Sequence, residues 1–180
     1  MKKHTAHNTL IFCLIIASLL FASCKDKGNE EAKKDDKTAV EGQWTTDFTD
    51  PSSGASITLT LTFTGTNFTF QENGQSNLTD DTTNPPTVLA TISLTFNMTG
   101  TFRLDAGQLL LTPKTATETT VTTLATDPSN PTTNTETGND ALTGSNWEIN
   151  HETPMGAYVV NGNTLTITPA GQQAQTYTKQ

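Results

Sequence analysis

The chain has 180 residues, a formal net charge of −8 at pH 7 and a hydrophobic fraction of 33%. After residue 40 its only lysine and arginine residues are Arg103, Lys114 and Lys179, so this part of the chain is strongly acidic. An acidic surface repels a phosphate backbone, which excludes nucleic acid as a partner.

The first 23 residues have the pattern of a secretory signal peptide. Two lysines precede an apolar stretch from Leu10 to Phe21. As a helix this stretch would rise roughly 18 Å, which is too short for the ~30 Å hydrocarbon core of a membrane. Small residues then precede Cys24, as a signal peptidase requires. We therefore predict that residues 1–23 are removed and that the mature chain starts at Cys24.

The residues LFASC, from Leu20 to Cys24, resemble the lipobox of bacterial lipoproteins. In that family the cysteine thiol is alkylated with a diacylglycerol, the chain is cut just before it, and the new amine is usually acylated. The resemblance implies that fatty acids on Cys24 anchor the protein, and two or three acyl chains hold a protein on a membrane far better than one. The alternative is an ordinary secreted protein that is cut near Ala22.

Residues 24–40 mix lysines with acids and contain almost no apolar side chain, so we expect a disordered tether. Lys25-Asp26 and the acid pairs after it resemble the lysine-then-acid export signal of some Gram-negative lipoproteins. This resemblance implies an outer-membrane protein whose domain faces the cell exterior, with the periplasmic face as the alternative.

Residues 41–180 are enough for one domain, and their strongest pattern has a period of two. In the segment 57–64 apolar residues alternate with threonines, and 91–98 repeats the alternation. Each is the pattern of a half-buried strand, with apolar side chains on one face and hydroxyl groups on the other. No segment after the signal peptide has helical spacing, so we predict an all-β domain.

Turn signals divide the domain into antiparallel hairpins. The segment 100–113 aligns without a gap on 156–169, and each reads as strand, tight turn and strand. Asp105-Ala106-Gly107 and Asn161-Gly162 supply the two turns. Asn73-Gly74 is predicted to end the strand before it. The polar, proline-containing stretch 125–145 is predicted to be a long flexible loop.

A meander of about 8–10 strands with one apolar face either closes into a barrel or folds into two sheets, and up-and-down closure removes exposed edges. Gly42-Gln43-Trp44 resembles the Gly-x-Trp motif of lipocalins, and 156–169 resembles the final hairpin of lipocalin-like lipoprotein domains. The resemblance implies that Trp44 packs at the closed end of a barrel, where lipocalins place an arginine over it. Lys179 is the only nearby base. An immunoglobulin-like sandwich is the alternative fold.

The sequence contains no catalytic motif, and we expect a protein that is not an enzyme and that has no cofactor and no metal. The barrel interior is the expected binding site, although an eight-stranded barrel can also be filled by its own side chains. The candidate lining is Leu61, Phe63, Phe70, Leu94, Phe96, Phe102 and Tyr158. Asp81-Thr82-Thr83 resembles a bacterial O-glycosylation acceptor, with the sugar on Thr82.

We therefore expect a lipid-anchored module that binds a small apolar ligand or another envelope protein, and that contacts the membrane through Cys24. The alternative is a structural or adhesion lipoprotein of the cell surface. Strand order separates the two folds, because a sandwich needs strands that cross between sheets.

Overall fold

The computed structural model describes residues 37–50, 54–80 and 82–180. The signal peptide, Cys24 and residues 25–36 of the predicted tether lie outside this range. Most of the described residues lie in antiparallel strands, and this confirms the all-β prediction. No helix among them is long and apolar enough to span a membrane.

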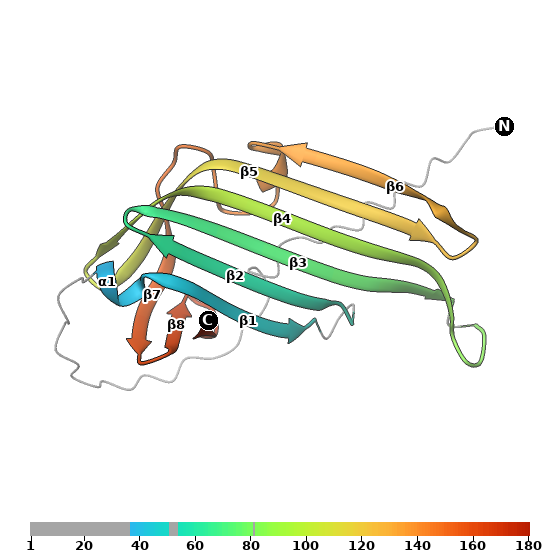
Figure 1. Ribbon diagram of the computed structural model, residues 1–180, viewed down its shortest axis with the longest axis horizontal. Coiled ribbons are helices and arrows are strands. Elements are labelled where there is room, and N and C mark those ends of the chain that lie inside the picture. Colours follow the sequence, from blue (N-terminus) through green and yellow to red (C-terminus); the bar gives the residue numbers. More distant parts are fainter. Residues whose placement is uncertain (1–36, 51–53, 81) are drawn as a thin grey trace.

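Nine strands form one sheet (Figure 1). The strands are β1 (Gly42–Thr49), β2 (Ser56–Thr64), β3 (Asn67–Asp80), β4 (Thr87–Asp105), β5 (Gln108–Leu124), β6 (Asp127–Thr137), β7 (Thr153–Asn161), β8 (Thr164–Thr168) and β9 (Gln175–Lys179). There are also two short helical elements: α1 (Lys37–Val40) precedes β1, and the 3-10 turn η1 (Asp140–Leu142) lies between β6 and β7.

Hydrogen bonding between the strands closes on itself as a ring. Each of β1 to β5 pairs with the next, β5 pairs with β7, and β8 and β9 lead back to β1. The closing contact pairs Trp44 with Lys179 and Thr45 with Thr178. All the described strands belong to this one sheet, so they do not form the two separate sheets of the alternative immunoglobulin-like sandwich.

Four strands continue beyond the ring. β2 stops opposite Gln75, and β7 pairs with only four residues of β5, 108–111. Beyond Gln75 the remaining lengths of β3, β4 and β5, together with β6, run on as a four-stranded sheet (Figure 1). We call this part of the sheet, with the residues of 72–75 that still pair with β2, the extension, and define it as residues 72–80, 87–96, 118–124 and 127–137.

The predicted loop 125–145 is wrong for most of its length, because β6 and η1 lie within it. β6 pairs with β5 from Thr117 opposite Thr137 to Leu124 opposite Asp127. All of its residues are exposed, so it has no buried apolar face that the sequence pattern could have indicated. Its threonines favour an extended backbone, and hydrogen bonding to β5 holds the segment as a strand.

Two further boundaries differ from the predictions. Asn73-Gly74 does not end a strand but lies inside β3, where Gly74 pairs with Ile57 on β2 and with Leu94 on β4. The tether was predicted to extend to residue 40, yet 37–40 form α1. The apolar side chain of Val40 is fully buried in the core, which holds this last turn of chain against the sheet.

The two hairpins of the sequence repeat have the same local construction. Gly100 and Gly156 occupy equivalent places, and an added Cβ would lie 2.1 Å from the Thr112 carbonyl oxygen in one hairpin and 2.5 Å from the Thr168 carbonyl oxygen in the other. Both positions therefore require glycine. The predicted turn after Asp105 is present, with positive φ at Ala106 and Gly107.

Candidate binding face on the inner side of the sheet

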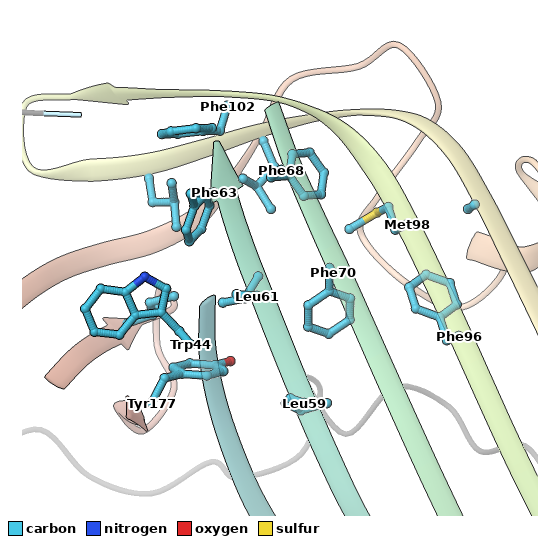
Figure 2. Packing of buried hydrophobic residues seen from close by; sticks show 14 of the residues in the cluster. Trp44, Leu59, Leu61, Phe63, Phe68, Phe70, Phe96, Met98, Phe102 and Tyr177 are labelled. Atoms are coloured by element: carbon cyan, nitrogen blue, oxygen red, sulfur yellow. The ribbon is translucent and has the colours of Figure 1, made fainter. Parts of the chain in front are cut away.

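The predicted interior residues lie together in one core. Leu61, Phe63, Phe70, Leu94, Phe96 and Phe102 are buried, and Tyr158 is partly buried against them. Phe63 and Phe102 meet edge to face with ring centroids 4.8 Å apart, and Phe70 and Phe96 do so at 6.0 Å (Figure 2). Within the ring these side chains pack on one another, so they act mainly as a core.

Trp44 is fixed at the end of the ring that carries α1. Its Nε1 donates a hydrogen bond of 2.7 Å to the Val40 carbonyl oxygen, and the Nζ of Lys179 lies 5.1 Å from the indole centroid. Gly42 has a φ of +118°, and an added Cβ would lie 2.8 Å from Cε of Lys179. The glycine and the tryptophan of the motif therefore both contact the same lysine.

The extension presents an inner face that continues the apolar side of the ring. The register places these side chains on that face: Glu72, Gly74, Ser76, Leu78, Ala90, Ile92, Leu94, Phe96, Glu118, Thr120, Thr122, Leu124, Thr132, Asn134 and Glu136. We call it the extension face. Its two ends differ: one carries carboxyl groups and the other carries exposed apolar groups.

Three glutamates lie in one row across the end of the face next to the ring. Glu72 pairs with Phe96, Phe96 with Glu118, and Glu118 with Glu136. Burial raises the pKa of Glu72, and the charge of Glu118 raises it further. Burial likewise raises the pKa of Glu118, with Glu136 as the second cause. The row therefore places partly desolvated carboxyl groups beside the apolar side chains of this face.

Tyr177 connects this row to the ring interior. Its ring is fully buried, and its hydroxyl donates a hydrogen bond of 2.8 Å to Oε1 of Gln175. Burial, and to a smaller extent the charge of Glu72, raises the pKa of the Tyr177 hydroxyl. The tyrosine is therefore un-ionised at neutral pH and serves as a hydrogen-bond donor.

Exposed apolar side chains gather at the far end of the extension. Leu78, Ala90 and Leu124 lie opposite one another on three adjacent strands. Leu78 is 44% exposed and Leu124 is 50% exposed, whereas the small side chain of Ala90 between them is covered. Val88 and Leu89, beside a β-bulge, are also exposed. Large apolar side chains are seldom gathered on a surface without a binding role.

The glutamate row could have been found in the sequence. Phe68, Phe70 and Glu72 alternate along β3, so a period of two already places the Glu72 side chain inward. The sequence prediction considered only apolar residues as lining, and it ended this strand at Gly74. Glu136 could not have been found in this way, because β6 was not predicted.

Thr82 is exposed in the turn between β3 and β4. Its backbone N–H and its Oγ1 both donate hydrogen bonds to Oδ1 of Asp80, at 3.0 and 2.6 Å, and these bonds lower the pKa of Asp80. The neighbouring Asp81 lies outside the described residues. Glycosylation of Thr82 therefore stays a prediction.

The described ion pairs belong to Arg103, which contacts Asp105 at 2.6 Å and Glu152 at 2.7 Å. The pKa of Glu152 is lowered by hydrogen bonds from Arg103, and this exposed pair lies away from the extension. In the part of the chain that the structure describes, no three His, Cys, Asp or Glu side chains are grouped so as to hold a metal ion.

Comparisons with protein-family models, curated proteins and solved structures found no match.

Proposed function

We propose that this protein is a bacterial lipoprotein anchored through lipid on Cys24 in the outer membrane and facing the cell exterior. In this proposal its domain is a lipocalin-like barrel that binds a small apolar ligand or a partner surface and catalyses no reaction. The ring of strand pairs is consistent with such a barrel. The contact of Trp44 with Lys179 also supports it, because Lys179 lies where lipocalins place an arginine over the corresponding tryptophan, although a lysine does not stack on the ring as an arginine does.

One observation carries the binding role. The ring interior is filled by its own aromatic side chains, whereas the extension face continues that apolar side beyond the strands β7, β8 and β9. Leu78 and Leu124 are about half exposed there. An apolar surface next to a rigid core is a common place for a ligand or a partner to bind.

Two experiments test the proposal. Wild-type protein should incorporate radiolabelled palmitate and partition into the detergent phase, and Cys24→Ala should do neither. Label retained by Cys24→Ala would contradict the lipid anchor.

The binding role is tested with Nile red, a neutral apolar dye that fluoresces when it leaves water. Its fluorescence should rise with the mature protein, and Leu124→Ser should reduce the rise. The matched control is Val159→Ser, because Val159 is 54% exposed on β7, away from the extension. Equal dye binding by both variants would contradict a site on the extension face.

A further inference from the structure

The extension face has a charge pattern as well as an apolar surface. At its far end the row Leu78, Ala90 and Leu124 continues to Asp127 on β6, and Asp80 ends β3 beside it. At the other end lies the row that contains Glu118 and Glu136. The apolar groups between these rows are therefore bordered by carboxyl groups on two sides.

No lysine, arginine or histidine occurs anywhere in the sequence of the extension. The described cations nearest to it in the chain are Lys114, whose Nζ donates a hydrogen bond to Oδ1 of Asn150, and Arg103, which is already paired with Asp105 and Glu152. The negative charge of the face is thus not balanced by the described strands. A partner that covers the face must bring either no charge or positive charge.

The dimensions of the face fit one helix. The row with Glu72 and the row with Leu78 are six residues apart along β3, which is about 20 Å of strand. Three strand spacings from β3 to β6 add a width of about 14 Å. A helix about 20 Å long has roughly 13 residues, and with its side chains it is about 10 Å wide.

We propose that the extension face binds a basic amphipathic helix of a partner protein. This inference rests on the proposed function and names the partner for the same surface. The apolar stripe of the helix would pack over the exposed side chains of Leu78 and Leu124 and over the partly exposed Ile92. Lysine or arginine residues near its two ends would lie over the glutamate row and over Asp127. A helix with acidic flanks would be repelled, so charge gives the face its selectivity.

The test uses the mature chain with Cys24→Ser, which keeps every described residue and carries no lipid. The probe is a fluorescent synthetic helix of about 14 residues, made of leucine on one face and lysine on the other. Its binding is followed by anisotropy, beside a helix of equal length with glutamate in place of lysine. We expect the lysine peptide to bind at least tenfold more tightly.

Three variants locate the contact. Leu124→Ser should weaken binding of the lysine peptide about fivefold, and Val159→Ser, the matched control, should leave it unchanged. Glu118→Gln with Glu136→Gln keeps the shape of the face and removes two charges. This double variant should weaken binding about fivefold in low salt, and the difference should shrink at high salt because exposed charges are then screened.

Several results would overturn the inference. Equal binding of the two peptides would remove the charge argument, and equal loss in Leu124→Ser and Val159→Ser would move the contact elsewhere. A wild-type dimer that Leu124→Ser dissociates would assign the face to a second copy of the chain. Nile red binding without peptide binding would leave the proposed function standing and exclude the helix, whereas loss of both would remove the two proposals together.

Discussion

Adjacent residues on β4 give the sharpest test of which face of the sheet is the core. Leu94 points to the inner face and is 6% exposed, whereas Thr95 points outward between Asn73 and Thr119. Replacing the leucine by Ala would cost about 2–5 kcal/mol. An aspartate adds the cost of a carboxylate with no described partner in an apolar surface, which is several kcal/mol.

The total loss for Leu94→Asp is thus about 5 kcal/mol or more, against a typical stability of about 5–15 kcal/mol for a whole domain. Urea unfolding followed by tryptophan fluorescence measures it. With a slope of about 2 kcal/mol per molar urea, the midpoint should fall by about 2 M, or the variant should be unfolded without urea. Thr95→Asp should change the stability by less than about 1 kcal/mol.

A third variant separates charge from polarity. Leu94→Asn has the shape of the aspartate without its charge, so at pH 7 it should be less destabilised than Leu94→Asp. The two should converge near pH 4, where the buried aspartate is protonated. Equal damage from Leu94→Asp and Thr95→Asp would show that both faces of the sheet are buried, and would refute the assignment of the inner face as the core.

Two further predictions use the same urea assay. Because the pKa of Glu72 is raised, ionising this group costs more free energy in the folded chain than in the unfolded chain. Its contribution to stability is therefore present below its ordinary pKa of 4.5 and is lost as the pH rises through the pKa of the folded state. Glu72→Gln should therefore be more stable than wild type at pH 8, and this difference should vanish below pH 4.5; a difference independent of pH would contradict the reasoning. Trp44→Phe loses the hydrogen bond to the Val40 carbonyl oxygen and should lower the free energy of unfolding by about 1–2 kcal/mol. Lys179→Met loses only the contact with the indole ring and should lower it by less than about 1 kcal/mol. A larger loss of stability from Lys179→Met than from Trp44→Phe would contradict this order.

The period-two patterns predicted the parts of the fold in which local sequence and tertiary burial agree. The alternations at 57–64 and 91–98 lie in β2 and β4, with their apolar residues inward. The turn after Asp105 was also predicted, because it needs positive φ and ends at a glycine. In these places a single strand or turn carries its own signal.

The errors occur where pairing between distant residues decides the structure. Asn73-Gly74 has the composition of a turn, yet β2 and β4 pair on either side of it and continue the strand through it. β6 has the composition of a loop, and it is a strand because β5 lies beside it. α1 depends on burial of one valine. The propensity of a short segment does not depend on contacts with distant residues, so the sequence pattern could not indicate these three features.

The glutamate row is the feature that stability alone explains least well. Like charges directly opposite on neighbouring strands destabilise a sheet, and Glu118 lies directly opposite Glu136. Burial of Glu72 and Glu118 adds a desolvation cost. Threonine occupies the neighbouring inner positions, Thr120 and Thr122, without either cost. Local departures from the rules of stable folding are typical of functional sites, so the same row that weakens the extension is the part of it best suited to recognise a positively charged partner.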